Sequence, residues 1–380
     1  MKVQANAPPR ACSVDSAPLL EVEDLRVTLA TARGPLHAVR GVDLTVARGR
    51  TLCLVGESGC GKSMTALALM GLLPRTATRT SGKMRFDGSD FGAQRAVASL
   101  RGRRIAMIFQ EPMTSLNPSF TIGDQLTEGA RRQLGLSRQG ARERAVQLLG
   151  RVGITNGGER LRQYPHELSG GLRQRVMIAM ALMPGPDLVI ADEPTTALDV
   201  TIQAQILRLL KQLQADVGIA LLLVTHDLGV VAQMADDVAV MYAGAIVERG
   251  PVAAVLGRPS HPYTRGLLAC LPEPGRTRRG QPLGTIAGTV PSLIGDLSGC
   301  QFRPRCPHAA PACEGDFPWQ HGAPGHRWHC TLLGGGGDWE ATSGRGTAST
   351  REAASTSGAA ATPGAASTRW GRAPDRGAAP

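Results

Sequence analysis

The chain has 380 residues, of which 42% are hydrophobic and 3% aromatic, so it is long enough for one large domain with an appendage or for two domains, with a mainly aliphatic core. Its formal net charge of +11 comes almost entirely from arginine, but no segment interleaves basic and aromatic residues, which argues against nucleic-acid binding and favours a solvated arginine-rich surface over an anionic membrane partner. No apolar run can span a bilayer and the first residues lack a secretory apolar region, so we expect a cytoplasmic protein in which disulfides are disfavoured.

Strand and helix patterns alternate along most of the chain. Residues 1–18 are rich in Ala, Pro and Ser and are predicted to be disordered. Alternation over 19–30 and 36–47 predicts two strands, and the apolar run 51–55 predicts a buried parallel strand. Helices are predicted at 62–73, over most of 121–183 and at 200–217, further strands at 104–109, 187–192 and 219–225, and a hairpin at 236–250. This order predicts an α/β fold with a mainly parallel sheet.

The character of the chain changes after residue 257. Proline becomes frequent, helical periodicity fades and four cysteines follow within a short segment. From residue 334 the composition is dominated by Gly, Ala, Ser and Thr, which cannot bury enough apolar surface to fold. We therefore predict a main domain at 19–257, a cysteine-bearing C-terminal extension at 258–333 and a disordered tail at 334–380.

The stretch GESGCGKS, residues 56–63, fits the phosphate-loop pattern G-x-x-x-x-G-K-[ST]. It follows a predicted strand and opens a predicted helix, so backbone N–H groups and the helix dipole face one anion. Lys62 adds a charge that reaches the β- and γ-phosphates, and Ser63 supplies a hydroxyl ligand for Mg²⁺. The alternative is a glycine-rich turn that matches by accident, which the strand and helix context disfavours. The predicted ATP-binding residues are Gly56, Glu57, Ser58, Gly59, Cys60, Gly61, Lys62 and Ser63.

A second acidic motif stands in LVIADEPTTALD, residues 188–199. The apolar strand ends in two carboxylates. Asp192 is predicted to hold Mg²⁺ through its water, and Glu193 to polarise an attacking water. An acidic pair at a surface strand end is the alternative, but it is disfavoured in a chain that already carries a phosphate loop.

Three further motifs complete a family pattern. HELSGGLRQRVMIAMAL (166–182) resembles the ABC signature, FQEP (109–112) the Q-loop and VTHD (224–227) the H-loop. With the two motifs above, the chain resembles an ATP-binding subunit of an ABC transporter. The resemblance implies a P-loop NTPase fold: a RecA-like α/β core, an antiparallel β subdomain, and a helical subdomain inserted between Gln110 and the signature.

The resemblance also assigns roles by position. Gln110 is expected to sense Mg²⁺ and the γ-phosphate, and His226 to contact the γ-phosphate and hold the attacking water. Asp199 falls at the D-loop, which crosses a dimer interface. Three signature residues are expected to bind the γ-phosphate of ATP held by the other subunit: Ser169, Gly170 and Gly171. One copy of each motif therefore implies a dimer, although Ser169 also suits a plain helix N-cap.

Two positions depart from the family pattern. Leu172 stands where the signature commonly has Gln. Leu29 lies near the position at which many such subunits stack adenine on an aromatic ring, and the first strand has no aromatic there. We expect adenine to be held by apolar contact, weakly or with poor base selectivity.

The extended Q-loop segment FQEPMTSLNPSFTIGDQLTE (109–128) and SHPYTRGLL (260–268) resemble the oligopeptide/dipeptide/nickel importer group. This implies an ATPase at the cytoplasmic face of the membrane that powers import of di- or oligopeptides. Its implied partners are a second, non-identical ATPase, two permeases and an extracytoplasmic binding protein, with no nucleic acid. A nickel or glutathione importer is the alternative, followed by a non-transport ABC ATPase acting on nucleic acid.

The four cysteines of the extension are Cys300, Cys306, Cys313 and Cys330. Their spacing is not that of a C-x2-C zinc ribbon. The resemblance to the importer group suggests a structural [4Fe–4S] cluster on these thiolates. Zinc, with histidines nearby, and no metal at all are the two alternatives.

Overall fold

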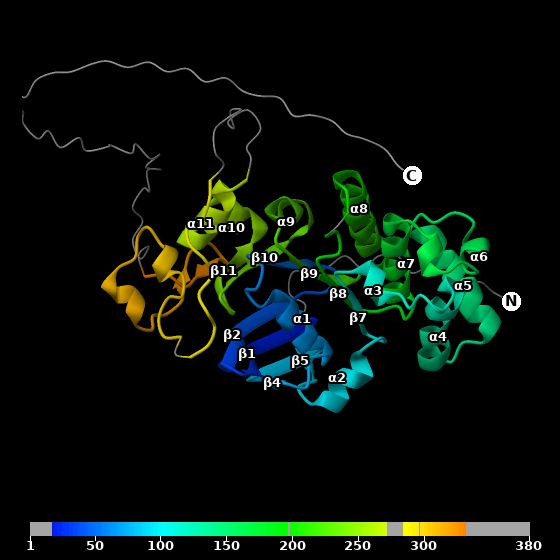
Figure 1. Cartoon of the computed structure of the whole chain (residues 1–380), viewed down its shortest axis with the longest axis horizontal. Helices are drawn as coiled ribbons and strands as arrows, with labels where there is room; N and C mark the ends of the chain where they lie inside the picture. Colours follow the sequence, from blue (N-terminus) through cyan, green and yellow to red (C-terminus); the bar gives the residue numbers. More distant parts are fainter. Residues whose placement is uncertain (1–16, 197, 272–283, 296, 332–380) are drawn as a thin grey trace, which may run out of the picture. The chain divides into compact units, whose positions relative to one another are not determined.

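The computed structural model describes residues 17–196, 198–271, 284–295 and 297–331 (Figure 1). The predicted disordered segments, 1–18 and 334–380, fall outside these residues except for 17 and 18. Both predictions therefore stay untested. Among the described residues, no helix combines the length and apolar character needed to cross a bilayer.

The first sheet is antiparallel and starts the ordered chain. Strand β1 pairs on one side with β2 and on the other with β5 and β4. Strand β6 pairs with the remaining edge of β5. The alternation predicted for β1 is interrupted at Asp24, whose φ of +49° accompanies a shift of register against β2. The strands are β1 (Leu20–Thr31), β2 (Gly34–Val46), β4 (Ala77–Thr80), β5 (Lys83–Phe86) and β6 (Ser89–Asp90). Sequence analysis predicted the first two and missed the short β4–β6.

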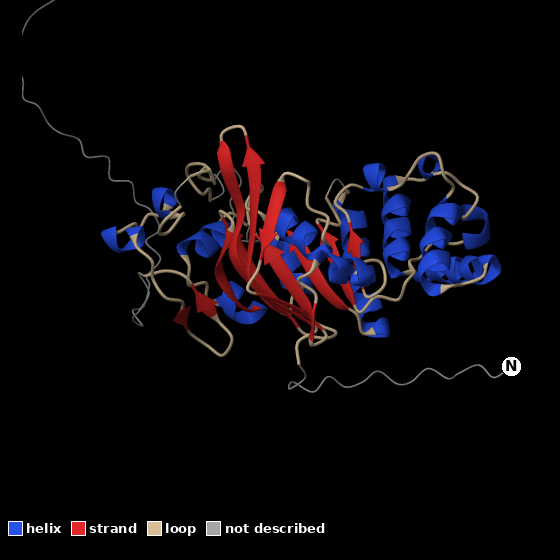
Figure 2. Ribbon diagram, turned by 90° about the horizontal axis from the view of Figure 1, so that it is seen from below, coloured by secondary structure: helices blue, strands red, loops and turns tan. Residues whose placement is uncertain are grey.

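The second sheet has the strand order β12-β13-β11-β10-β3-β9-β8-β7, and its segment from β10 to β7 is parallel (Figure 2). Strands β3, β8 and β9 are buried along their whole length, as their continuous apolar runs predicted. The bounds are β3 (Thr51–Val55), β7 (Ile105–Ile108), β8 (Leu188–Asp192), β9 (Ala220–Thr225), β10 (Asp237–Tyr242), β11 (Ala245–Pro251), β12 (Gln320–His321) and β13 (Arg327–Trp328).

This sheet separates two hydrophobic cores. Leu52 and Leu54 of β3 face the core shared with the antiparallel sheet and α1 (Lys62–Met70). Cys53 and Val55 face the opposite core, which continues into the helical group. Because successive side chains of a strand point to opposite faces, one apolar run fills both cores.

The predicted long helical region forms the helical group at the green end of Figure 1. The region is divided into separate helices at Gly135, Gly153 and Asn156, which all have positive φ. Its elements are α3 (Pro112–Ser115), α4 (Ile122–Leu134), α5 (Arg138–Arg151), α6 (Gly157–Arg160), the 3₁₀ turn η1 (Pro165–Glu167) and α7 (Gly170–Leu182). The remaining helices are α2 (Gln94–Leu100), α8 (Val200–Val217), α9 (Leu228–Met234), α10 (Val252–Gly257), α11 (Pro262–Ala269), η2 (Arg303–Arg305) and η3 (Pro311–Glu314).

The C-terminal extension joins the main sheet. Strand β13 pairs with β11, with Trp328 opposite Glu248, and β12 pairs with β13. The Glu248 carboxylate is fully buried and accepts hydrogen bonds from the backbone N–H groups of Ser260 and His261 at 2.7 and 2.9 Å. Its Oε1 also lies 2.8 Å from His326 Nε2. No pattern in residues 320–328 predicted that these strands would extend the sheet of the main domain.

Candidate nucleotide site

The phosphate loop lies where the sequence places it, between the end of β3 and the start of α1. Gly61 is the residue before α1 and has a φ of +104°. A Cβ atom at Gly61 would lie 2.2 Å from the backbone oxygen of Ala38, so only glycine fits both the conformation and the space. The loop is thus tied to β2 by a backbone approach that a side chain would prevent.

Lys62 is held at the mouth of this loop. Its Nζ donates hydrogen bonds to the backbone oxygens of Gly56 and Glu57, at 2.8 and 2.9 Å. Lys62 is almost fully buried, and its positive charge lies inside the loop that it closes. Cys60 is also buried and burial raises the pKa of its thiol, which fits a small filler of the loop rather than a reactive group.

Two of the three residues predicted at the Mg²⁺ site, Ser63 and Asp192, contact each other. Ser63 Oγ donates a hydrogen bond to Asp192 Oδ1 at 3.0 Å. Burial raises the pKa of Asp192, the hydrogen bond from Ser63 lowers it, and the neighbouring Glu193 charge raises it again, so that the net shift is upward. A hydroxyl beside a buried carboxylate suits a hard divalent cation, whose charge would offset the cost of burying the anion.

Glu193 is the centre of a polar network one residue beyond β8. Its φ of +44° is unusual for a residue with a side chain and turns the carboxylate toward neighbouring loops. Oε1 lies 3.1 Å from His226 Nδ1, while Oε2 accepts hydrogen bonds from Thr196 at 2.9 Å and Gln110 at 3.3 Å. The structure therefore brings the predicted Glu193, His226 and Gln110 together.

The pKa of Glu193 follows from the same contacts. Burial raises the pKa, but the hydrogen bonds from His226 and Thr196 and the positive charge of Lys62 outweigh burial and lower it overall. The carboxylate is therefore ionised at neutral pH and able to accept a proton or orient a water.

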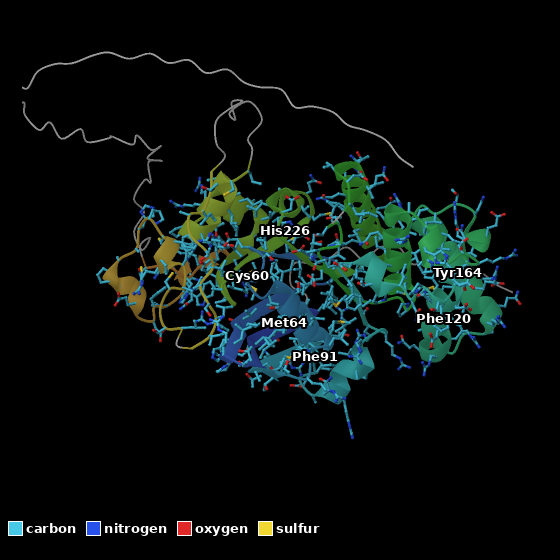
Figure 3. The ribbon with its side chains drawn as sticks, in the orientation of Figure 1. Cys60, Met64, Phe91, Phe120, Tyr164 and His226 are labelled. Atoms are coloured by element: carbon cyan, nitrogen blue, oxygen red, sulfur yellow. The ribbon has the colours of Figure 1, made fainter. Side chains whose placement is uncertain are left out.

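A cavity of about 990 Å³ joins these groups. Its polar end is lined by loop residues together with Gln110, Glu193 and His226, and its apolar end includes Leu29 and Leu36. Residues 290–294 of the extension line it as well, and Leu293 accepts a hydrogen bond from the backbone N–H of His37 at 2.8 Å. Met64 and His226, both labelled in Figure 3, belong to this cavity, whereas Phe120 and Tyr164 lie in the helical group.

The signature residues stand apart from this cavity. Ser169 caps α7, its side chain accepting a hydrogen bond from the backbone N–H of Leu172 at 3.4 Å, and both Ser169 and Gly170 are exposed. Asp199 caps α8 in the same way, through the N–H of Ile202 at 2.9 Å. The first turn of α7 therefore presents free N–H groups to solvent, as an anion site requires, and the N-cap alternative for Ser169 is also realised.

The described residues match known proteins along most of their length. The sequence profile described as ABC transporter matches residues 39–196, and that described as oligopeptide/dipeptide transporter, C-terminal region, matches residues 247–313. The dipeptide transport ATP-binding protein DppD of Bacillus subtilis is 48% identical over 305 residues, which cover 80% of this chain and 90% of that protein. The chain belongs to the ABC transporter ATP-binding subunits of the oligopeptide/dipeptide group.

Other members of the ABC family agree. The oligopeptide transport ATP-binding protein OppD of Salmonella typhimurium is 48% identical over 314 residues, 82% of this chain and 93% of that protein. A putative peptide import ATP-binding protein of Brucella abortus is 52% identical over 313 residues, 79% and 93% of the two chains. The solved cbiO1 structure of Clostridium perfringens, part of the ABC transporter complex cbiONQ, matches at a TM-score of 0.55 and 28% identity, covering 64% of this chain and 92% of that one. The predicted ABC ATPase fold is confirmed.

The four predicted metal ligands of this ABC subunit give a different result. Cys300 is close enough to Cys306, Cys313 and Cys330 for the three thiols to contribute, after burial, to raising its pKa to about 11. Its backbone N–H also donates to the oxygen of Cys313 at 2.8 Å. In the part of the chain that the structure describes, however, no three His, Cys, Asp or Glu side chains are grouped as ligands of one metal ion. The four thiols are neighbours, but the described residues do not form the ligand group of the predicted metal centre.

Sequence reasoning missed three residues of the site. Thr196 lies inside the quoted acidic motif, and its position three residues after Glu193 was the only available signal. Tyr263 stands in the quoted HPYT segment, and its hydroxyl oxygen accepts a hydrogen bond from the N–H of Glu57 at 2.9 Å. Arg305 lies between two of the cysteines and pairs with Glu57, a contact that no local pattern indicates.

Proposed function

We propose that this chain is the ATP-hydrolysing subunit of an ABC importer and powers uptake of di- or oligopeptides. The observation that carries the proposal is the Glu193 network, a carboxylate with a lowered pKa at the cavity of a phosphate loop and within hydrogen-bonding distance of His226 and Gln110. The substrate class is supported by the relatives, whose names describe dipeptide, oligopeptide and peptide transport.

Each residue has a role that follows from its chemistry. Lys62 and the backbone N–H groups of the loop bind the phosphates, and Ser63 and Asp192 would hold Mg²⁺, with Gln110 beside them. Mg²⁺ neutralises charge on the β- and γ-phosphates. Glu193 takes a proton from, or orients, the attacking water, and His226 holds that water against the γ-phosphate.

The partner ATPase is part of the proposal. We expect ATP bound at the phosphate loop of one subunit to meet Ser169, Gly170 and Gly171 of the other, with Asp199 at the interface between them. The exposure of the first turn of α7 supports this arrangement. Val200, which follows Asp199, is 82% exposed, as an apolar residue reserved for an interface would be.

Permease contact is proposed at a second cavity. Its volume is about 490 Å³ and it lies between the Q-loop and α7, with mostly apolar walls that include Phe109, Met107 and Met180. A peripheral position at the cytoplasmic face, with two permeases and an extracytoplasmic binding protein, follows from the proposed import function. The apolar walls support a protein segment rather than a small anion as occupant.

A [4Fe–4S] cluster on Cys300, Cys306, Cys313 and Cys330 is proposed as a structural cofactor, with zinc as the alternative. The nearness of the other three thiols to Cys300 supports it. Binding would require these thiols to converge further than they do here. Iron, sulfide and zinc analysis of protein purified without oxygen tests the proposal: four irons per chain are expected for a cluster, and protein free of both metals contradicts it.

Purification of this chain together with membrane permeases from the same cells tests the function. We expect the full chain to co-purify with them and its ATPase activity to rise when a peptide-loaded binding protein is added. Stimulation by nucleic acid without association with permeases would contradict import. Stimulation by nickel- or glutathione-loaded binding protein alone would assign the alternative substrates.

A further inference from the structure

The C-terminal extension touches the phosphate loop through a partly buried ion pair, in which the arginine is buried and the Glu57 side chain is 28% exposed. Arg305 Nη1 lies 2.6 Å from Glu57 Oε2, and Nη2 donates to Glu57 Oε1 at 3.0 Å. The two groups face each other in the bidentate geometry that a guanidinium and a carboxylate share. Only 4% of the Arg305 side chain is exposed, so solvent screens this pair far less than it screens a surface pair.

The guanidinium is fixed from its other sides as well. Nε donates to the backbone oxygen of Ala287 at 2.9 Å, and Nη2 donates to that of Ile286 at 3.1 Å. Tyr242 Oη accepts from Nη1 at 3.4 Å. With its N–H groups held by the extension and by β10, Arg305 offers Glu57 a rigid partner rather than a mobile one.

A second contact reaches the same loop residue. Tyr263 is fully buried, and its hydroxyl oxygen accepts the hydrogen bond of the Glu57 backbone N–H at 2.9 Å. The ring packs against Tyr242 at 4.6 Å and Phe302 at 5.4 Å between centroids. Both the side chain and the main chain of Glu57 are therefore held by residues that follow the main domain.

We propose that Arg305 and Tyr263 are positioning residues that hold the phosphate loop in its nucleotide-binding shape, so that the extension is part of the ATP site. The proposal rests on the proposed ATPase function. The Glu57 N–H points to Tyr263, while the loop residues that follow it line the phosphate end of the cavity. Fixing Glu57 limits the conformations that the loop must give up when it closes on phosphate. Residues 290–294, which line the same cavity, place a second part of the extension at the site.

The test is nucleotide affinity in the full chain, with fluorescent ATP and Mg²⁺ as the probe. We expect Arg305→Met to raise the Kd for ATP about tenfold and to raise the KM for ATP in parallel, while kcat changes less. The reason is that the free energy of ordering the loop then has to come from ATP binding. Arg305→Lys should recover only part of the loss, since an ammonium cannot match both carboxylate oxygens. Arg303→Met is the matched control, because Arg303 forms its ion pair at 2.7 Å with the exposed Glu314, which lies outside the phosphate loop.

A double-mutant cycle separates positioning from mere stability. Glu57→Gln and Arg305→Met should each raise the Kd for ATP. The Kd of the double variant should not exceed that of the single variant with the higher Kd. Additive effects on Kd, or a folded Arg305→Met variant with wild-type Kd and a lowered Tm, would overturn the proposal. Should Arg305→Met fail to fold, Tyr263→Phe keeps the ring and removes the acceptor, and an unchanged Kd in that variant would overturn the proposal too. Wild-type protein that binds no ATP would instead refute the proposed function.

Discussion

The phosphate loop is glycine-rich and the C-terminal extension is proline-rich, and different kinds of contact shape the two segments. Much of the loop's shape comes from its own main chain: Gly61 takes a φ of +104° and Lys62 bonds to oxygens only a few residues away, and the extension adds contacts to Glu57. The extension is set by side chains that contact residues far along the chain, as Arg305 contacts Glu57 and His326 contacts Glu248. Local geometry can be seen in a motif, whereas distant pairing cannot.

This difference predicts where substitutions act. Changes in the loop and its catalytic network should remove chemistry and leave folding nearly intact. Changes in the buried Glu248 contacts of the extension should lower stability first, whereas a change at Arg305 should weaken ATP binding.

Glu193→Gln should lower kcat about 1000-fold, because the amide cannot take a proton from the attacking water. The variant keeps the acceptor for Thr196, and ATP binding should persist. Phosphate release and nucleotide binding, measured on the same preparation, check both parts. A kcat within about tenfold of wild type would show that another group activates the water.

Gly61→Ala should lower ATP affinity by roughly 100-fold, since the new Cβ would lie 2.2 Å from the backbone oxygen of Ala38 and the loop must move. Gly59→Ala is the matched control. Gly59 also has a positive φ, +78°, but a Cβ there meets nothing within 4 Å, so only backbone strain of about 1 kcal/mol is added. Equal losses in the two variants would mean that strain, and not the contact with Ala38, sets the loop.

Glu248→Gln should lower the free energy of unfolding by about 2–3 kcal/mol, because one buried carboxylate accepts from three donors. Glu314→Gln provides the comparison: Glu314 is 68% exposed and pairs with Arg303, and such pairs contribute about 0–1 kcal/mol. Denaturant unfolding of the full chain gives both values. Similar losses in the two variants would contradict the view that buried pairs hold the extension to the sheet.

Ser169→Ala should lower stability by about 1 kcal/mol through loss of the α7 cap, and Ser137→Ala should do the same for α5, where Ser137 accepts from the N–H of Gly140 at 3.1 Å. Only the Ser169 variant should also lower ATPase activity, because only α7 is proposed to meet ATP in the partner subunit. Thermal unfolding and ATPase assays check the pair. Equal ATPase activity in the two variants would mean that Ser169 acts only as the N-cap of α7.

Much of the fold and of the site was predictable. Strands β3, β8 and β9 are continuous apolar runs, and the loop and the Asp192–Glu193 pair follow them directly in the sequence. Ser63 contacts Asp192 and Glu193 contacts His226, so residues with expected roles in one nucleotide site lie together. These contacts form because the carboxyl ends of parallel strands meet at one edge of a sheet. The fold itself therefore brings together residues that are distant in the sequence.

The parts of the fold and site that the sequence did not predict depend on contacts between distant segments, which the pattern of one segment does not show. Strands β6, β12 and β13 have two residues each, too few to show alternation, and β13 forms because β11 has an open edge. The pairing of Arg305 with Glu57 joins residues 248 positions apart. Residues 290–294 of the extension line the cavity together with Leu29, near which the first strand has no aromatic residue.

Uptake of labelled substrate into vesicles holding the permeases and this chain tests the central claim most directly. The account predicts uptake of a labelled di- or oligopeptide that requires the binding protein outside, this chain and Mg-ATP inside, and that is lost with Glu193→Gln. Uptake of nickel or glutathione with no peptide uptake, or peptide uptake that persists with the Glu193→Gln variant, would contradict it.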